Sequence, residues 1–330
     1  MQPTVLIAIG GNALIRAGEP ATVAAQRTHV ADTCRAIADI VSEGWRVVIT
    51  HGNGPQVGAA LLRSERAAGE AYPLPLDVCV AGTQGEIGFL LQQALGEALE
   101  ARGVRRPVAT VLTQVVVAPG DPGFARPTKP IGPFYSHSET AGRRALGWTM
   151  VEEPPHGYRR VVASPEPLEI VEEPVIRTLV DANIVVITLG GGGIPVVRNG
   201  HRLTGVEAVI DKDLASALLA IRLQVDRFIL STDVDRIYLD YGNPKARGLD
   251  GVTTDGLRHH AAAGHFPPGT MGPKVEAVLR FVEACEREAI VTSYDRLSLA
   301  LQGLAGTHVF ATARAVQDGA TPVTTARGTR

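Results

Sequence analysis

Two loops of the sequence combine glycine with asparagine directly after an apolar, strand-like run. The loop at 10–12 (Gly-Gly-Asn) follows VLIAI, and the loop at 52–54 (Gly-Asn-Gly) follows RVVITH. Glycine lets backbone N–H groups approach a ligand because it has no Cβ, and a helix that begins beyond such a loop favours an anion. Since the carboxyl ends of neighbouring parallel strands share one crevice, we predict that both loops line a single ligand-binding site.

A third glycine run, at 190–193, follows the apolar run IVVITL and is a candidate anion-binding nest. It does not match the G-x-G-x-x-G fingerprint, because Pro195 stands where the last glycine would be. The chain has no Gly-Lys pair of a Walker A loop and none of the HRD or DFG signatures of protein kinases. A phosphate bound here would therefore use a different cradle.

The lysines are the second chemical feature. Among 32 cationic side chains there are four lysines, Lys129, Lys212, Lys245 and Lys274. A lysine ammonium is a compact charge on a flexible stem, so arginine does not replace it where a charge must follow a phosphoryl group. Lys129 (PTKPIGPFY), Lys212 (VIDKD) and Lys274 (GTMGPKVEA) lie in proline- or glycine-framed stretches or at a helix start, whereas Lys245 is predicted to be a solvated loop residue.

The VIDKD stretch starts a predicted helix. Asp211 and Asp213 suit its first turn because carboxylates there interact favourably with the helix dipole. Lys212 opposes the dipole, and a site that needs a point charge for a phosphate would explain its presence.

The histidines are weaker candidates. His51 could act as a general base, although a histidine at the end of a strand more often only makes a hydrogen bond. His259, His260 and His265 have no carboxylate or cysteine at ligand spacing, so they predict no metal site.

The elements that must position these residues alternate between strand-like and helical patterns. Strand-like runs at 5–9, 46–50, 107–117, 184–189, 227–232, 289–293 and 307–310 alternate with helical patterns at 22–42, from Pro55, at about 82–101, from Asp211 and from Pro273. This alternation predicts an α/β fold with a largely parallel sheet that is covered on both faces.

Two segments depart from the pattern. Nine of the 22 prolines lie between Pro119 and Pro167, and we interpret the segment of about 118–166 as an inserted lid or small subdomain. The segment after about 313 has no periodicity and is predicted to be disordered.

Composition excludes several classes of protein. With 45% hydrophobic residues and 330 residues in all, the chain can bury a sizeable core. A formal net charge of −2 gives no field to hold a polyanion, so nucleic acid is not expected as a partner. Cys34, Cys79 and Cys285 indicate neither disulfides nor zinc, and we find neither a secretion signal nor a membrane span. The expected setting is the cytoplasm.

The motifs GGNAL, THGNGPQVG, PTKPIGPFY, RRVVASPEP, GGGGIPV, GVEAVIDKDLASALLA, LSTDVD and GTMGPKVEA occur in this order. Over about residues 4–310 the chain closely resembles the carbamate kinases, a family within the amino acid kinase superfamily. The resemblance implies a three-layer αβα sandwich with an open, mainly parallel central sheet and a small protruding lid subdomain. It also implies a carbamate-binding half at 1–225 that includes the lid, a nucleotide-binding half at 226–312, and a homodimer.

The same resemblance implies reversible phosphoryl transfer between MgATP and carbamate, giving ADP and carbamoyl phosphate. The residues implied to bind carbamate and the phosphoryl group are Gly11, Asn12, Gly52, Asn53 and Gly54, with Lys129 closing over them from the lid. Lys212 and Lys274 are implied to neutralise charge between the phosphates, and Asp213 to orient them or to assist Mg²⁺, which the nucleotide carries. The implied nucleotide site comprises Gly10, Ser231, Asp233, Tyr238, Met271 and Lys274.

Two alternatives stay open at this stage: a non-catalytic nucleotide-binding homologue, and a related kinase of another small acid. A regulatory remnant would be free to lose Lys129, Lys212, Asp213 or Lys274, and all four are present. The sequence therefore favours an active carbamate kinase.

Overall fold

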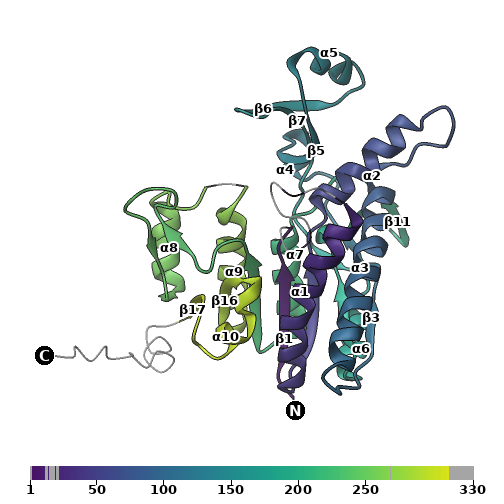
Figure 1. Ribbon diagram of the computed structural model, residues 1–330. Coiled ribbons are helices and arrows are strands. Elements are labelled where there is room, and N and C mark those ends of the chain that lie inside the picture. The colour runs from purple at the N-terminus through teal and green to yellow at the C-terminus, as the bar shows by residue number, and fades with distance from the viewer. Residues whose placement is uncertain (1, 12–13, 15–18, 20–21, 268, 312–330) are drawn as a thin grey trace, which may run out of the picture.

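The computed structural model describes residues 2–11, 14, 19, 22–267 and 269–311, and Figure 1 shows their arrangement. Asn12 and the segment 313–330, for which the sequence predicts a ligand contact and disorder, lie outside the described residues.

The first strand shows why helices must cover both faces of the sheet. β1 (Thr4–Ile9) is buried along its whole length, and its side chains alternate between two apolar clusters. Leu6 and Ala8 belong to one cluster, whereas Val5 and Ile7 belong to the other. A strand that is apolar on both sides is stable when it lies between two layers of helices.

Within the described residues, eight strands form the central sheet, and neighbouring strands are parallel except β16 with β17. In order across the sheet they are β15 (Gly251–Thr253), β17 (Thr307–Phe310), β16 (Ala289–Ser293), β12 (Arg227–Thr232), β1, β2 (Arg46–His51), β9 (Val185–Thr188) and β3 (Val108–Thr110). This confirms the predicted fold class, an α/β fold with an open and mainly parallel sheet.

Helices cover both faces, so the body has three layers (Figure 1). The face of Ile7 is covered by α1 (Val23–Ser42), α3 (Leu76–Glu100) and α10 (Leu297–Leu301), which follows η3 (Tyr294–Arg296). The face of Leu6 is covered by α6 (Glu173–Asp181), α7 (Lys212–Leu223), α8 (Thr254–Ala262) and α9 (Met271–Cys285).

Helix α3 begins earlier than the expected range of about 82–101. Its first residue is Leu76, and the backbone N–H of Leu76 donates to Oε1 of Glu207 at 2.9 Å. This carboxylate satisfies an otherwise free donor at the helix start. Because Glu207 is far away in the sequence, local periodicity cannot show it.

The expected strand-like run at 107–117 is two strands in two sheets. β3 belongs to the central sheet, and β4 (Gln114–Val116) belongs to a second sheet of the described chain. The strands of that sheet are, in order, β11 (Arg202–Gly205), β10 (Ile194–Asn199), β4 and β8 (Glu169–Ile170). Between β3 and β4 the buried Gln84 side chain accepts from the N–H of Thr113 at 2.8 Å and donates to its carbonyl at 3.1 Å, which replaces ladder hydrogen bonds.

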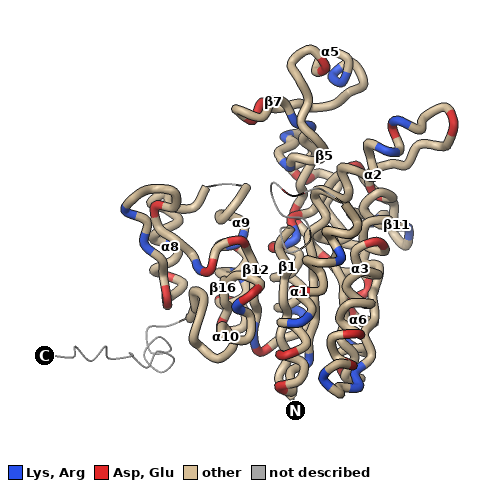
Figure 2. Tube along the Cα trace, in the orientation of Figure 1, with Lys and Arg blue, Asp and Glu red and all other residues tan. Residues whose placement is uncertain are grey.

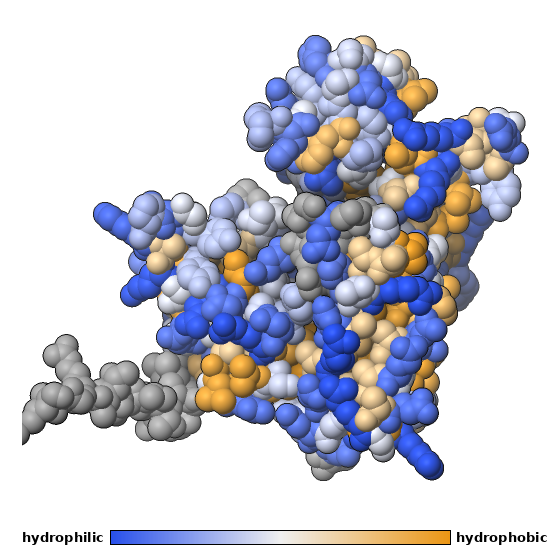
Figure 3. All heavy atoms as spheres, viewed as in Figure 1, coloured by the Kyte–Doolittle hydropathy of each residue, from blue (hydrophilic) through white to orange (hydrophobic). Residues whose placement is uncertain are grey.

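A small sheet stands away from the body at the end where α2 (Gly54–Arg66) projects (Figure 1). Within residues 129–162 three antiparallel strands lie in the order β5 (Lys129–Tyr135), β7 (Gly157–Val162) and β6 (Thr149–Glu153), with α5 (His137–Ala145) between β5 and β6. We call residues 129–162 the protruding unit. In the space-filling view it forms a knob above the body that is mostly hydrophilic on the face shown (Figure 3).

Shorter elements complete the chain. They are α4 (Pro122–Ala125), η2 (Gly190–Gly192), β13 (Tyr238–Leu239) and β14 (Arg247–Gly248). Basic and acidic positions are interspersed along the trace rather than separated by sign (Figure 2). In the part of the chain that the structure describes, no helix has the length and apolar character needed to cross a membrane.

The contact between β12 and α9 generates a stability prediction. Phe228 and Phe281 are fully buried with ring centroids 5.4 Å apart. We expect Phe281→Ala to lower the free energy of unfolding by about 3–5 kcal/mol, because it leaves a cavity in the core. Urea unfolding monitored by circular dichroism measures this. Leu304→Ala is the control, since Leu304 is 71% exposed; equal stability of the two variants would contradict the prediction.

Candidate active site

The glycines that follow β1 and β2 lie at the carboxyl edge of the central sheet. β1 and β2 are parallel neighbours with Ile9 paired to His51, so the loops that follow them leave the sheet side by side. The N–H of Gly52 donates to the carbonyl of Ile9 at 3.3 Å, and a Cβ added at Gly52 would lie 3.6 Å from the amide nitrogen of Gly11. The structure therefore brings Gly11 and Gly52 together.

The second loop leads into helix α2, whose first residue is Gly54. Asn53 occupies the N-cap position but does not cap the helix with its side chain. Its Nδ2 donates to Oγ1 of Thr83 at 2.9 Å instead. The backbone N–H groups in the first turn of α2 therefore lack a side-chain cap, and they form the positive end of the helix dipole. This end of α2 is suited to an anion.

The glycine run at 190–193 is buried and supports the site from behind. Gly191 and Gly192 have φ values of 66° and 89°, a region that favours glycine. A Cβ at Gly191 would lie 2.2 Å from Nδ2 of Asn53, and one at Gly192 would lie 2.5 Å from the carbonyl oxygen of Ile210. The run thus fits against loop 52–54 and against the segment before α7, and it does not line the cavity described below.

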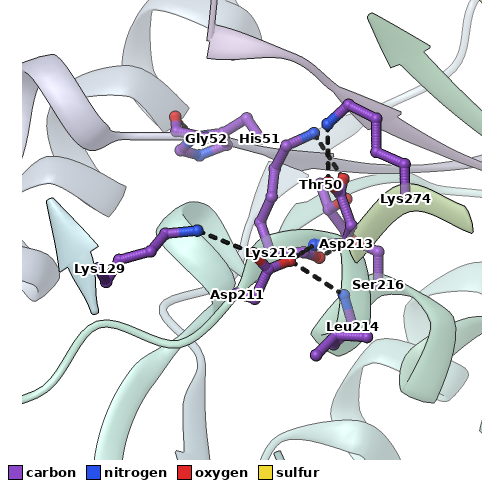
Figure 4. Close-up of polar contacts among 10 residues, drawn as sticks. All are labelled: Thr50, His51, Gly52, Lys129, Asp211, Lys212, Asp213, Leu214, Ser216 and Lys274. Atoms are coloured by element: carbon purple, nitrogen blue, oxygen red, sulfur yellow. Dashed lines mark hydrogen bonds and ion pairs between the residues drawn. The ribbon is translucent and has the colours of Figure 1, made fainter. Parts of the chain in front are cut away.

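A buried carboxylate joins two helix starts. Asp213, in the first turn of α7, is 4% exposed. Lys274, from the first turn of α9, donates from Nζ to Oδ2 of Asp213 at 2.8 Å, and Nζ of Lys212 lies 3.1 Å from Oδ1 (Figure 4). Three of the residues proposed for catalysis from the sequence therefore form one charged group.

Burial affects the three charges differently. It raises the pKa of Asp213, but the ammonium groups of Lys212 and Lys274 outweigh it and hold that pKa well below its usual range. Burial lowers the pKa of Lys274, yet Asp213 reverses the effect and the pKa is raised. For Lys212 burial prevails, with Lys274 acting in the same direction, so its pKa is lowered in spite of Asp213.

The Lys212 ammonium lacks a full set of partners. Its contact with Asp213 does not have hydrogen-bond geometry, and Nζ finds no hydrogen-bond acceptor in the described part of the chain. A buried ammonium without an acceptor costs free energy that an incoming anion would recover. With two ammonium groups on one carboxylate, this part of the site has the charge to receive an anion.

Lys129 approaches the start of α7 from the side opposite Lys274 (Figure 4). Its Nζ donates to Oδ2 of Asp211 at 2.8 Å (Figure 4), while Oδ1 of Asp211 accepts from the N–H of Asp213 at 2.9 Å and caps the helix. The helix dipole predicts Asp211 at this position from the sequence, but it does not predict the pairing with Lys129. The place of Asp211 next to Lys212 in VIDKD was the available signal.

His51 makes the structural hydrogen bond that its position at a strand end indicates. Burial lowers the pKa of His51 to about 4, helped by the Lys212 ammonium and opposed by a hydrogen bond to Gly52. The neutral ring donates from Nδ1 to the Gly52 carbonyl at 3.0 Å. Its Nε2 faces the backbone of Gly190, where an added Cβ would lie 2.7 Å away. This arrangement supports loop 52–54 and does not favour a general base.

A cavity of about 600 Å³ opens beside the lysine pair. Of the residues proposed for the nucleotide, those that line it are Gly10, Asp233, Tyr238, Met271 and Lys274. Gly11 and Lys212 line it as well.

Ser231 stands apart from the cavity wall. It is 2% exposed, and its carbonyl oxygen lies 2.9 Å from where a Cβ at Gly10 would be. Gly10 therefore allows the end of β1 to approach β12 closely.

Three further residues of the cavity wall are not predicted from the sequence. Asp240, Tyr241 and His265 line the cavity, and Nδ1 of His265 lies 3.1 Å from Oδ1 of Asp240. From the sequence, His265 has no predicted role, because its spacing indicates no metal site. Its pairing with Asp240 across 25 residues is set by tertiary structure.

Known proteins with similar sequences and structures show the family of the chain. The model of the amino acid kinase family matches residues 3–293. Carbamate kinase of Thermococcus kodakarensis is 48% identical over 92% of this chain and 98% of that protein, and carbamate kinase of Pyrococcus furiosus is 45% identical over 94% and 99%. The structure of carbamate kinase from Giardia lamblia bound to AMP-PNP superposes with a TM-score of 0.89 at 41% identity, covering 94% of this chain and 98% of that one. The chain belongs to the amino acid kinase family, and within it to the carbamate kinases.

Proposed function

We propose that the chain catalyses reversible phosphoryl transfer between MgATP and carbamate, giving ADP and carbamoyl phosphate. The observation that carries this proposal is the buried Lys212–Asp213–Lys274 group at the wall of the cavity. Two ammonium charges on one carboxylate leave a net positive site where a phosphoryl group can be held. The identity to the carbamate kinases of Thermococcus kodakarensis and Pyrococcus furiosus supports the choice of acceptor.

The nucleotide occupies the 600 Å³ cavity in this proposal. Its wall comes largely from residues 226–312, which we assign as the nucleotide-binding half, with Tyr238 and Met271 beside the adenosine. The relative from Giardia lamblia that binds AMP-PNP supports this assignment. Lys274 reaches from the same wall toward the phosphates.

Carbamate and the transferring phosphoryl group bind, in this proposal, at the end of the cavity where Gly11 and Lys212 line its wall. Here the backbone N–H groups of Gly11 and of loop 52–54, together with the uncapped start of α2, hold the anions. Residues 1–225 form this half, and the segment of about 118–166 acts as its lid. Lys129 stands at the start of β5, and its release from Asp211 would free the ammonium to contact the acceptor.

Catalysis by this arrangement is mainly positioning and charge stabilisation. Lys212 and Lys274 neutralise the charge that develops between the β- and γ-phosphates. Both oxygens of Asp213 face ammonium groups, so its role is to orient the lysines rather than to bind a metal.

The divalent metal of the reaction comes with the nucleotide, and we propose Mg²⁺. In the part of the chain that the structure describes, no group of three His, Cys, Asp or Glu side chains can hold a metal ion. When bound with the nucleotide, Mg²⁺ would supply charge neutralisation at the phosphates.

We also propose that the protein works in the cytoplasm. Its three cysteines are unpaired thiols, which suits a reducing compartment.

A second copy of the chain is the expected partner, and we propose that it packs on α3. Phe89 and Leu112 are more than half exposed there, and the hollow between α3 and β3 has the small residues Gly85 and Gly96 in its wall. A helix with small residues permits close approach of an identical helix across a twofold axis.

The direct test is ATP formation from ADP and carbamoyl phosphate with Mg²⁺. We expect a kcat on the order of 1–10³ s⁻¹, in the usual range for enzymes. Acetyl phosphate is the parallel substrate, and preferred turnover of it would indicate a kinase of another small acid. ADP binding without any turnover would indicate the non-catalytic homologue.

Lys274→Arg tests the need for a point charge. The planar guanidinium cannot reproduce the contact between Nζ and Asp213, so we expect kcat to fall by roughly 10²-fold or more while the fold is kept. Lys245→Arg is the control, because Lys245 is exposed. A near-normal kcat for Lys274→Arg would count against its role.

Phe89→Glu tests the dimer. Phe89 is 56% exposed, so the change should not disturb the monomer, but it places a carboxylate in the proposed interface. We expect light scattering to give the mass of two chains for the wild type and of one chain for the variant. Leu304→Glu, elsewhere on the surface, should stay dimeric; a dimeric Phe89→Glu would exclude this face.

A further inference from the structure

The protruding unit carries one residue of the proposed site at its base. Lys129 is the first residue of β5, and it contacts the body through Asp211. Where its ammonium stands depends on how the whole unit is seated. The unit packs on helix α2, which runs along β5. The first residue of α2, Gly54, belongs to the proposed site.

Close to Lys129, the backbone of α2 lies directly against the backbone of β5. A Cβ at Gly58 of α2 would lie 2.4 Å from Cα of Gly132 in β5, and Gly132 has a φ of 72°. Ile131 of β5 packs in the same apolar cluster as Val57 and Leu61 of α2. These contacts set a short distance between strand and helix at the base of the protruding unit, close to Lys129.

Farther from the site, a charged contact joins the outer part of the protruding unit to the body. Glu65, near the end of α2, lies between two arginines of the protruding unit, with Oε2 3.3 Å from Arg143 and Oε1 3.6 Å from Arg160. Arg160 also lies 3.7 Å from Glu207, in the segment before α7. The carboxylates belong to the body and the guanidinium groups to the protruding unit, so the contact joins one to the other.

The two arginines are themselves held in place by aromatic rings. The guanidinium carbons of Arg143 and Arg160 lie 4.7 and 4.5 Å from the ring centre of Trp148, and that of Arg143 also lies 4.7 Å from the ring centre of Tyr135. Stacked guanidinium groups have little freedom to follow a moving carboxylate. Glu65 therefore meets a pair of fixed partners.

This arrangement is a poor way to gain stability. Burial raises the pKa of Glu65 even though both arginines lower it, and burial lowers the pKa of Arg160. Charges that are taken partly out of water at such separations recover little of their desolvation cost. What the contact does supply is a fixed orientation.

We propose that Glu65 is a positioning residue: by holding Arg143 and Arg160 it fixes the protruding unit against α2 and thereby sets where Lys129 stands at the active site. The inference rests on the proposed function, because it takes Lys129 as the residue that closes over the acceptor. Glu65 itself does not line the nucleotide cavity.

The first experiment is a kinetic comparison of Glu65→Ala with wild type in ATP formation. We expect kcat/KM for carbamoyl phosphate to fall at least roughly tenfold, as displaced catalytic groups do, with KM for ADP unchanged. Glu173→Ala is the matched control: Glu173 is 25% exposed against 27% for Glu65, and it pairs with Arg177 on α6, away from the site.

The second experiment reads the position of Lys129 without activity. Mild acetylation followed by mass spectrometry reports each of the four lysines separately. We expect labelling of Lys129 to rise several-fold in Glu65→Ala, with Lys212, Lys274 and Lys245 unchanged. Glu65→Gln, which keeps the side-chain volume, repeats both measurements if circular dichroism shows that the alanine variant unfolds.

Unchanged labelling of Lys129 would overturn the proposal. So would raised labelling together with normal kinetics in an active enzyme, because the position of Lys129 would then not matter. If the wild type forms no ATP, the proposed function fails, and the labelling still decides whether Glu65 sets the position of Lys129.

Discussion

Asp213 is buried between two ammonium groups, and the rest of the site depends on this contact. The carboxylate stays ionised because Lys212 and Lys274 outweigh the burial that opposes ionisation. In return it draws together the starts of α7 and α9, the helices that precede the neighbouring strands β12 and β16. The Lys212 ammonium still lacks a hydrogen-bond acceptor. The contact that joins α7 and α9 therefore also prepares the site for an anion.

The surrounding structure keeps this group in place from several sides. Thr50 at the end of β2 shares a 2.6 Å hydrogen bond with Ser216 of α7, which ties the helix to the sheet (Figure 4). Asp211 caps α7 with one oxygen and holds Lys129 with the other. One carboxylate thus connects the helix that bears two site residues to the strand that begins the protruding unit.

Much of the fold could be predicted because its signal is local. Runs such as RFILST at 227–232 are strands in the structure because an apolar, β-branched run flanked by polar residues has no better place than a buried sheet. The helix start at VIDKD is equally local, since Asp211 caps the residues that follow it. By contrast, the early start of α3 depends on Glu207, and the division of 107–117 into two strands depends on Gln84. Neither partner lies near in the sequence, so periodicity could not reveal it.

The sequence by itself determined which residues could do chemistry: glycine loops after strands, and lysines where arginine would be expected from the composition. Residue type and spacing carry that information because backbone freedom and charge are properties of single residues. Tertiary structure decided which of them act together. It paired Lys129 with Asp211 and placed His265 and Asp240 in the cavity wall. It left Ser231 and the glycine run at 190–193 outside that wall. It also brought the protruding unit into contact with Glu65. Each of these depends on distances between segments far apart in the chain, which are set by packing and not by local propensity.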